Sequence, residues 1–379
     1  MNELTTFTPG EIWLDDRGTP INAHGGGILF HQGVYYWFGE HKIAGDAGNR
    51  AQVGVHVYWS RDLYNWKDAG IALAVSADPE SEIAKDCVLE RPKVIYNPKT
   101  GKFVMWFHLE LKGHDYQAAR AGVAVADRPL GPYTFLRSFR PDAGSWPVNV
   151  SESEKAAIHD PAVMAEMNAR QFPGGSNPDT PRYPILARDY AGGQMSRDMT
   201  LFVDDDGKAY QIRASEENST LHISLLSDDY LTTAGKYVRV FENRWHEGPT
   251  LCKRKGRYWL LASDCTGWAP NAARSAVADS IWGPWKELGN PATGINPQNG
   301  MGPEKTFGGQ STFLLPVAGQ QDAFIAMLDL WHPDNAIDGR YIWLPVRFAD
   351  DRFTMAWSSQ WDLRFFNFQH RTAAKEKRA

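Results

Sequence analysis

Aromatic and aliphatic residues alternate with small or polar residues along most of this chain, and the alternation recurs in paired segments. The first member of each pair follows a turn, and five occur: GVYYWFGE (33–40), GKFVMWFH (101–108), GKAYQIRASE (207–216), GRYWLLASD (256–264) and QQDAFIAMLDLW (320–331). A second alternating segment follows each one, at 53–66, 121–133, 220–232, 273–285 and 340–354. A period of two residues is typical of β-strands, and no stretch of comparable length has helical periodicity. The pattern therefore predicts five strand-rich units.

Five such units favour radial repetition, because four-stranded sheets around an axis protect their edges without closing into a barrel. We therefore expect an all-β, five-bladed β-propeller that spans 1–379 as a single domain. A large β-sandwich is the main alternative. It does not predict that the second segment of four units ends in a similar turn with an aspartate and an aromatic residue: SRDLYNW, ADRPLGPY, SDDYLT and ADSIWGPW.

The widest gap between units contains residues 136–197, which are rich in Pro, Gly, Ser and Asn. We interpret this segment as a long insertion and expect it to cover one face of the disk. Three consecutive glycines, Gly25–Gly27, precede the first aromatic segment. The innermost strand of a propeller blade lines a crowded axis, so these glycines are expected to let backbones approach closely. A phosphate-binding loop is not indicated, because no helix follows them.

The net charge and the distribution of apolar residues exclude some classes of binding partner. The formal net charge is −5, and no run of Lys or Arg is long enough to follow a phosphate backbone, so nucleic acid is not expected. No apolar run reaches the length needed to span a membrane, and MNELTTFTPG has no secretory leader pattern. We expect a cytoplasmic protein as written, or a secreted or periplasmic one if a leader has been removed. Fifteen Trp suit sheet packing and stacking on sugar rings.

No cofactor and no metal site are predicted. Cys87, Cys252 and Cys265 are too few and too scattered for a zinc site, although a single Cys252–Cys265 disulfide stays open. DDDG at 204–207 lacks the full spacing of calcium ligands, so we interpret it as a turn.

Polar residues at the start of inner strands converge on the central channel of a propeller, where ligands bind by default. Two acids stand out, Glu90 in LERPKV and Glu247 in HEGPTL, because apolar neighbours and a nearby proline surround each. Such a setting removes water from a carboxylate and raises its pKa, as a general acid near neutral pH requires. Several acids facing one concave site favour glycoside hydrolysis. The other candidates are His24, Glu40, which is expected to close an inner strand, Asp198 and Gln310.

These motifs together resemble glycoside hydrolase family 43. The five-unit pattern, YWSRDLYNW, ERPKV, SRDMTLFVDDDGKAY, EGPTL and GPW carry the likeness, which runs from about Pro20 to Phe366. HGGGIL, YYWFGE, SEEN (215–218), TGWAPN (266–271) and GGQST (308–312) are similar to the exo-β-1,3-galactanase branch. The resemblance implies a five-bladed propeller that inverts the anomeric centre and releases galactose from β-1,3-galactan, the backbone of arabinogalactans.

The resemblance also implies roles for residues. Glu247 would be the general acid, and Glu90 would tune its pKa and position the substrate. Asp198 would hold the sugar in the −1 subsite and Glu40 would bind its hydroxyls. Many family members carry an aspartate base in the first blade, but INAHGGG has none, and the exo-galactanase branch shares this loss. Gln310 matches the glutamine proposed there to orient or activate the water.

The remaining candidates are weaker. Trp268 in TGWAPN is expected to stack on a sugar face, and His24 is a candidate for substrate binding. Trp37 and Trp331 are interpreted as packing residues. Asp15 and Asp16 in LDDRG are expected to be turn residues, although they are the spare carboxylates if Gln310 is not the base.

Several alternatives stay open at this point. The same scaffold could act as an α-L-arabinofuranosidase, a β-galactofuranosidase or a β-xylosidase, because loops determine the shape of subsites. A non-catalytic carbohydrate-binding propeller is compatible with the missing aspartate. A phosphorylase needs clustered basic residues, and only Arg91 and Arg197 lie beside the proposed acids. In each glycosidase or binding interpretation the partner is an oligosaccharide or polysaccharide, and the sequence does not predict the oligomeric state.

Overall fold

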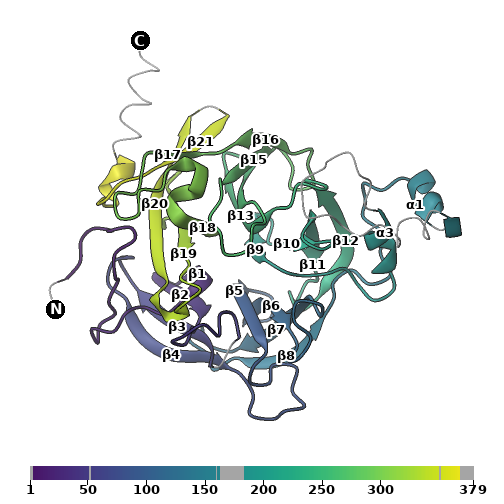
Figure 1. Cartoon of the computed structure of the whole chain (residues 1–379), viewed down its shortest axis with the longest axis horizontal. Helices are drawn as coiled ribbons and strands as arrows, with labels where there is room; N and C mark the ends of the chain where they lie inside the picture. Colours follow the sequence, from purple (N-terminus) through teal and green to yellow (C-terminus); the bar gives the residue numbers. More distant parts are fainter. Residues whose placement is uncertain (1–2, 51–52, 159, 163–182, 350, 368–379) are drawn as a thin grey trace.

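The computed structural model describes residues 3–50, 53–158, 160–162, 183–349 and 351–367. In these residues, five β-sheets, antiparallel apart from one short edge strand, are arranged around one axis, so the predicted five-bladed β-propeller is confirmed (Figure 1). The 3-10 helices Pro303–Gly308 and Ala336–Asp338 lie in the loops of the last blade. The described part of the chain contains no helix that is both long and apolar enough to cross a bilayer.

Each of the first four blades is a meander of four consecutive strands. Blade 1 contains β1 (His24–His31), β2 (Val34–Glu40), β3 (Gly54–Ser60) and β4 (Lys67–Ala74). Blade 2 contains β5 (Val88–Asn97), β6 (Lys102–Glu110), β7 (Arg120–Ala126) and β8 (Thr134–Phe139). Blade 3 contains β9 (Met199–Val203), β10 (Ala209–Ser215), β11 (Thr220–Leu226) and β12 (Thr233–Val240). Blade 4 contains β13 (Glu247–Arg254), β14 (Arg257–Ser263), β15 (Arg274–Ala278) and β16 (Lys286–Gly289).

Blade 5 differs because a short strand from the preceding loop extends its outer edge. Its strands are β18 (Gly309–Pro316), β19 (Phe324–Leu330), β20 (Arg340–Ala349) and β21 (Arg352–Ala356), with β17 (Ala292–Thr293) parallel to β21. The first strands of the blades, β1, β5, β9, β13 and β18, are neighbours around the axis, and β18 also packs beside β1. The ring therefore closes between the first and the last blade.

Both ends of the described chain meet at this closure. Phe7 and Trp361 exchange two backbone hydrogen bonds, and their rings stack 4.4 Å apart. A cluster of buried indoles lies between blades 1 and 5 and includes Trp37, Trp66 and Trp343. Burial of large aromatic side chains contributes strongly to stability, so this cluster accounts for part of the high tryptophan content. The prediction that Trp37 is a packing residue is confirmed.

The triple glycine lies where β1 lines the axis and approaches the neighbouring strands. A Cβ atom at Gly26 would lie 1.7 Å from the carbonyl oxygen of Phe38, and one at Gly27 would lie 2.5 Å from the side chain of Lys93. Gly25 has a φ of +60°, in the left-handed region that disfavours residues with a Cβ. The expectation that these glycines permit close approach is therefore confirmed.

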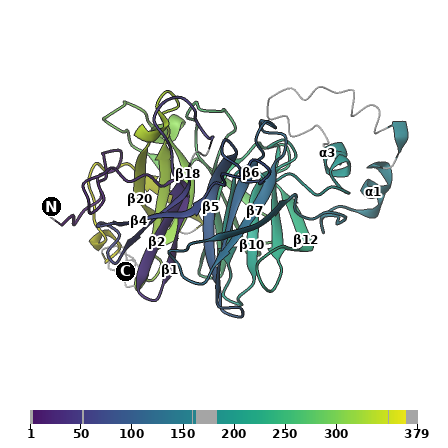
Figure 2. The ribbon, with the colours of Figure 1, turned by 90° about the horizontal axis from the view of Figure 1, so that it is seen from below.

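The segment between blades 2 and 3 contains two short helices, α1 (Glu152–Ile158) and α3 (Tyr183–Arg188). Both lie at the rim of the disk, beyond the outer strand of blade 3 (Figures 1 and 2). The backbone N–H of Val148 donates to Tyr237 on β12, and Leu186 packs on the same tyrosine. The two helices and the segment around Val148 thus lie beside blade 3 rather than over a face, whereas residues 136–139 of the expected insertion belong to β8 of blade 2 and Arg197 lies at the pocket described below. Residues 159 and 163–182 of the expected insertion lie outside the described residues.

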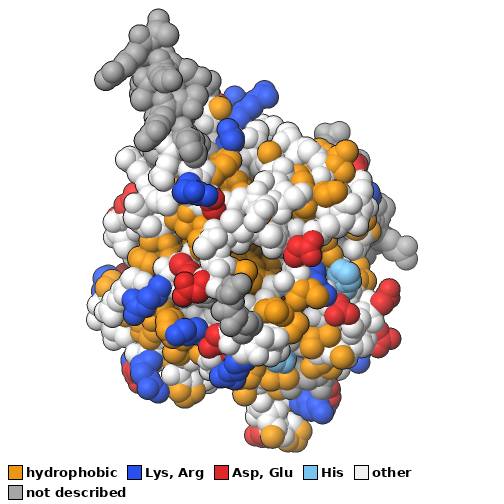
Figure 3. All heavy atoms as spheres, turned by 90° about the vertical axis from the view of Figure 1, so that its left-hand side faces the viewer, with side chains coloured by type: hydrophobic (Ala, Val, Ile, Leu, Met, Phe, Trp, Pro, Cys, Tyr) orange, Lys and Arg blue, Asp and Glu red, His pale blue; other side chains and the backbone are white. Residues whose placement is uncertain are grey.

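The cysteines, the DDDG segment and the surface charges bear on smaller expectations. Cys87, Cys252 and Cys265 are all free thiols, so the structure contains no Cys252–Cys265 disulfide. DDDG at 204–207 forms the turn between β9 and β10, closed by a hydrogen bond from Gly207 to the carbonyl of Asp204. On the side shown in Figure 3, acidic and basic side chains are interspersed, in keeping with the small net charge.

Candidate active site

Three inner strands carry the same local distortion at the same depth in the propeller. The register of β1, β5 and β13 against the second strand of the blade shifts directly after His24, Glu90 and Glu247 respectively. The residue that follows each, Gly25, Arg91 or Gly248, has a φ between +54° and +60°. A bulge of this kind bends a strand and redirects its side chains. Glu90 and Glu247 therefore occupy equivalent positions in blades 2 and 4, and His24 occupies that position in blade 1.

A carboxylate from an adjacent part of the ring satisfies each distorted peptide. The N–H of Gly25 donates to Asp329 at 2.6 Å, that of Arg91 to Glu40 at 2.9 Å, and that of Gly248 to Asp198 at 2.8 Å. Hydrogen bonds to an ionised acceptor are the stronger kind, which helps the non-glycine Arg91 to keep a left-handed conformation. The repeated motif thus also determines where Glu40 and Asp198 lie.

These residues surround one pocket of about 280 Å³ at the mouth of the axis. Six of the predicted site residues line it: Glu40, Glu90, Asp198, Glu247, Trp268 and Gln310. Glu40 was expected to close an inner strand, but it ends β2, the second strand of blade 1, where it pairs with His24 of β1. Its carboxylate still reaches the pocket because the bulge at Gly25 leaves room for it.

His24 is not among the residues that line the pocket. It is fully buried, stacks on Tyr341, and its Nδ1 lies 3.8 Å from Asp329. Burial lowers the pKa of His24 well below its ordinary value, so the ring is neutral near pH 7. Asp15, in turn, accepts hydrogen bonds from the backbone of Arg17 and Thr19, which confirms its expected place in a turn.

Glu90 is held as a carboxylate. Its oxygens accept hydrogen bonds from Tyr116 at 2.7 Å and from His108 at 2.7 Å, and the other nitrogen of His108 faces the buried Glu110 at 2.8 Å. Burial alone would raise the pKa of Glu90, but the hydrogen bond and charge of His108, together with the charge of Lys42 and the hydrogen bond of Tyr116, outweigh it and lower the pKa to about 2. Burial likewise lowers the pKa of His108, yet Glu110 and Glu90 raise it to about 9. The prediction of a raised pKa is therefore wrong for Glu90.

Glu247 has the opposite setting. The donors to its carboxyl group are neutral: Asn218 at 3.0 Å and the Cys265 thiol at 3.2 Å, both to Oε1. Burial raises its pKa to about 7, and the negative charge of Asp198 reinforces the shift. The effect of Glu90 has the same direction but is smaller than that of Asp198. The prediction of a raised pKa is confirmed for Glu247, so this carboxyl group can carry a proton near neutral pH.

Arg91 organises the floor of the pocket between these acids. Its guanidinium group donates to both oxygens of Asp198, at 3.1 and 2.8 Å, and to Oε1 of Gln310 at 2.5 Å. The same amide oxygen accepts the indole N–H of Trp331 at 3.0 Å, and the Nε2 atom of Gln310 donates to Ser263. Arg and Trp side chains only donate hydrogen bonds, so they determine which way the amide points.

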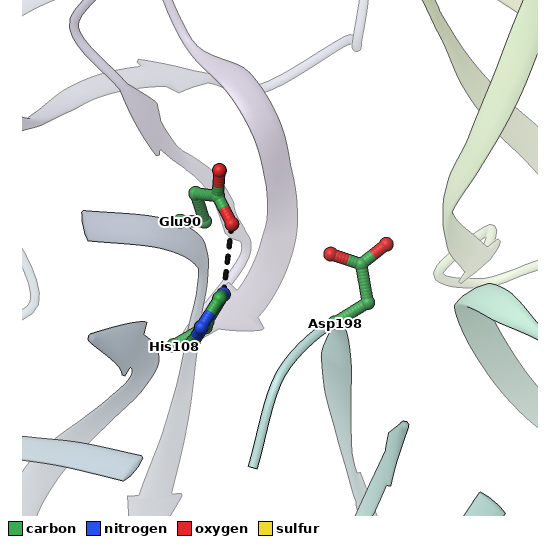
Figure 4. A group of neighbouring side chains, drawn as sticks. All are labelled: Glu90, His108 and Asp198. Carbon is green, nitrogen blue, oxygen red and sulfur yellow. Dashed lines mark hydrogen bonds and ion pairs between the residues drawn. The ribbon is translucent and has the colours of Figure 1, made fainter. Parts of the chain in front are cut away.

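The Glu90, His108 and Asp198 side chains have ligand atoms within 4.8 Å of one another, a spacing that would suit a metal ion. Figure 4 shows His108 directed at Glu90, with Asp198 joined to neither. Both nitrogens of His108 are hydrogen-bonded to carboxylates, and a ring with a pKa of about 9 is protonated near neutral pH. A metal ligand must be deprotonated, so Glu90 and His108 fit a hydrogen-bonded pair rather than a cation site, and Asp198 is engaged by Arg91 instead.

Other residues that line the pocket did not emerge as ligands from the sequence. They are Asn49, Arg91, His108, Tyr116, Arg197, Asn218, Gly267 and Trp331. Strand alternation places Arg91 on the opposite face from Glu90, and only the bulge brings both to the pocket. Trp331 was interpreted as packing, but it lines the pocket and bonds to Gln310. His108 had a signal in the repeat, because it stands at the same distance after its turn glycine as Glu40 and Ser263 do.

Comparison with known proteins agrees with this geometry. A family model described as "Glycosyl hydrolases family 43" matches residues 182–311. The curated "Xylosidase/arabinosidase 43B" of Humicola insolens is 28% identical over 130 residues, which is 30% of this chain and 24% of that protein. An exo-β-1,3-galactanase from Phanerochaete chrysosporium, solved with β-1,3-galactotriose, is 30% identical over 95% of this chain and 68% of that one, with a TM-score of 0.72.

A second solved structure is more similar. It is a GH43 β-1,3-galactosidase in complex with galactodeoxynojirimycin, and it is 47% identical to this chain. The alignment covers 94% of this chain and all of that one, with a TM-score of 0.82. A family 43 relative matched over its whole length at this identity leaves no doubt of kinship, and the chain is a glycoside hydrolase that belongs to family 43.

Proposed function

We propose that this protein is an inverting, exo-acting glycosidase that releases galactose from the non-reducing end of β-1,3-galactan. The observation that carries the proposal is the pair of equivalent acids with opposite environments in one pocket: Glu247 with a pKa of about 7 and Glu90 with a pKa of about 2. An acid that is protonated near neutral pH beside groups that stay ionised is what glycosidic bond cleavage requires. The likeness to proteins named β-1,3-galactosidase and exo-β-1,3-galactanase supports the choice of sugar and linkage.

In this proposal Glu247 protonates the glycosidic oxygen as the bond to C1 breaks. The negative charges of Asp198 and Glu90 favour the positive charge that develops on the sugar ring. Asp198 and Glu40 accept hydrogen bonds from the hydroxyls of the terminal galactose, and Trp268 stacks on a sugar face. Arg91 holds the carboxylate of Asp198 in the correct direction through its two hydrogen bonds.

Gln310 orients the attacking water in this proposal, and its amide N–H is the group best suited to do so. Its Oε1 atom already accepts hydrogen bonds from Trp331 and the positively charged Arg91, which makes that oxygen a weak proton acceptor. The residue therefore fixes the direction of water attack on C1 rather than removing the proton by strong basicity. Orientation alone contributes substantially to rate when the reacting atoms are held close together.

The size of the pocket favours action at a chain end. Its volume of about 280 Å³ lies just below the range of about 300 to 1,000 Å³ typical of ligand pockets, which suits one terminal sugar better than a long segment of polymer. Trp268 is 43% exposed at the rim and lies edge-on to Trp331, with ring centroids 6.0 Å apart. An exposed indole at the rim of the pocket is well placed to contact the sugar that leaves.

Product analysis tests the proposal. The enzyme is incubated with β-1,3-galactobiose and, in parallel, with nitrophenyl arabinofuranoside, galactofuranoside and xyloside, and the products are followed by mass spectrometry and NMR. Release of galactose that first appears as the α-anomer, from the disaccharide alone, supports an inverting exo-galactanase. Cleavage of a furanoside or a xyloside in place of galactobiose overturns the substrate but keeps the catalytic acid.

A further inference from the structure

The carboxyl group of Glu247 is bound asymmetrically. Oε1 accepts hydrogen bonds from the Asn218 amide at 3.0 Å and from the Cys265 thiol at 3.2 Å. Within the described residues, no protein group donates to Oε2. In a protonated carboxyl group, one oxygen carries the proton and the other only accepts hydrogen bonds. An oxygen that already accepts from two donors is the one that stays unprotonated. The arrangement thus distinguishes two oxygens that are chemically equal in a free carboxyl group.

We propose that Asn218 and Cys265 are positioning residues that fix the acid proton of Glu247 on Oε2 and direct it at the glycosidic oxygen. The inference rests on the proposed function, in which Glu247 is the general acid. The proton moves from Oε2 to the glycosidic oxygen as the bond between that oxygen and C1 breaks, while the oxygen of water bonds to C1 and the water releases one of its protons to bulk solvent. Glu247 is left as a carboxylate that the same two donors stabilise, and solvent returns a proton before the next turnover.

Asn218 is presented to Glu247 by an unusual turn. Glu216, Glu217 and Asn218 have φ values of +50°, +57° and +66°, three consecutive non-glycine residues in the left-handed region. Such a conformation is unfavourable for each residue and persists only where the surroundings impose it. The turn would relax to a more favourable backbone conformation if nothing held it. Neighbouring side chains must therefore hold it in place.

The turn is anchored by buried charges around Glu216 in blade 3 and by partly exposed ion pairs of Glu217, and no catalytic step uses either. Glu216 is fully buried and accepts hydrogen bonds from Arg239 at 2.6 and 2.7 Å and from His222 at 2.7 Å. Glu217 pairs with Arg188 of α3 and with Arg197 at the pocket, each at 3.1 Å. Removing one partner from a buried ion pair is costly, so the turn is held firmly. These charges thereby hold the amide of Asn218 on Oε1 of Glu247.

Cys265 is fixed from the other side of the pocket. Its backbone N–H donates to Asp264 at 2.9 Å, and Asp264 pairs with Arg274 at 2.5 Å. The charged groups that act on Glu247 are Asp198 before β9 and Arg91 and Glu90 on β5, and each has strong partners of its own. Replacement of Asn218 or Cys265 therefore removes a neutral donor without removing a charge.

Two galactosides with different leaving groups test this role. β-1,3-Galactobiose has a poor leaving group that needs the proton, whereas dinitrophenyl β-galactoside has a good one that needs little help. We expect Asn218→Ala and Cys265→Ala each to lower kcat about tenfold on galactobiose and less than twofold on the aryl galactoside. Cys265→Ser keeps a donor at the same place and is the matched control, with near wild-type rates on both.

A second readout is the pH profile. Because the thiol hydrogen bond favours the charged form of Glu247, its loss in Cys265→Ala should move the alkaline limb of kcat/KM to higher pH, and Cys265→Ser should restore it. Equal losses on both galactosides with an unmoved pH profile would overturn the inference and leave a packing role. If the wild-type enzyme cleaves neither galactoside, the proposed function itself fails and the inference falls with it. Thermal melting of each variant separates these outcomes from unfolding.

Discussion

The two sides of the pocket place a glutamate at the same point of the same structural unit and give it opposite chemistry. Glu90 and Glu247 both precede a left-handed residue and a proline at a bulge in the first strand of a blade. The residue opposite each on the second strand differs: His108 faces Glu90, and Ser263 faces Glu247. A histidine between two carboxylates keeps its proton and holds Glu90 ionised, whereas a serine supplies no charge. One cross-strand neighbour therefore separates a permanent anion from a proton donor.

The largest expected effect comes from removing the proton on the blade 4 side. Glu247→Gln keeps the shape of the side chain but cannot give up a proton, so we expect kcat on galactobiose to fall by about 100- to 10,000-fold. Circular dichroism and thermal melting should show an intact fold, because the amide can still accept the hydrogen bonds of Asn218 and Cys265. A rate within a few fold of wild type would remove Glu247 from the mechanism and end the comparison of the two acids.

Gln310 allows a sharper question, because it lies between the two sides and bonds to Arg91. If its amide N–H orients the water, Gln310→Glu should lower kcat at least tenfold, since it replaces that donor with a carboxylate. Gln310→Ala should lose a similar amount. If Gln310 instead acts as the base, the glutamate variant should keep or exceed the wild-type rate. Near wild-type activity of the alanine variant would mean that another carboxylate, Glu40 first among those lining the pocket, activates the water.

The stability contributions of the two acids should change with pH in opposite directions. The pKa of Glu247 in the folded state, about 7, lies above its ordinary value of 4.5, so the folded protein holds this proton more tightly and loses stability as the pH rises from about 4.5 to 7. The pKa of Glu90, about 2, lies below 4.5, so its contribution is present above about pH 4.5 and is lost as the pH falls toward 2. We expect the Tm of Glu247→Gln to lie above that of the wild type at pH 8 and to equal it at pH 4.5.

For Glu90→Gln we expect a Tm several degrees below wild type at pH 8, because His108 loses one of its two carboxylate partners. The deficit should shrink as the pH is lowered below 4.5, where wild-type Glu90 begins to lose its advantage. Differential scanning fluorimetry of both variants from about pH 2.5 to pH 8 measures the two trends together. Shifts of the same sign in both variants would contradict the opposite environments of the two acids.

The comparison also shows what the sequence could and could not predict. Alternation and recurrence predict the five blades, because both follow directly from the two-residue period of a strand. The same recurrence leads to Glu90, Asp198, Glu247 and Gln310, since each stands at the entrance of an inner strand, and the structure brings them into one pocket. His24 stands at the equivalent entrance in blade 1, but its ring packs on Tyr341 away from the pocket, and a residue pattern does not reveal which way a side chain turns.

The charge states of the acids could not be predicted from the sequence, for a different reason. Apolar neighbours along the chain predicted desolvation of both Glu90 and Glu247, but pairing across strands decides the outcome, and the partner comes from a residue 18 positions away, His108. Register is set by the hairpin and by the bulge, and a bulge changes which side chains share a face. Arg91 illustrates the same point, because only a distorted backbone lets adjacent residues of a strand face one pocket.

The smallest expected effect concerns metal chelation. Glu90, His108 and Asp198 are close enough to suggest a cation site, but His108 bonds to carboxylates through both nitrogens and Asp198 is engaged by Arg91. A cation there would have to displace a protonated histidine and compete with a guanidinium group, both of which already balance the carboxylates. We therefore expect overnight dialysis against EDTA to change kcat on galactobiose by less than twofold, and added Ca²⁺ or Mn²⁺ to restore nothing. A large loss that a divalent cation reverses would show that His108 gives up its proton to the metal, and Glu90 would then be a ligand rather than a free anion.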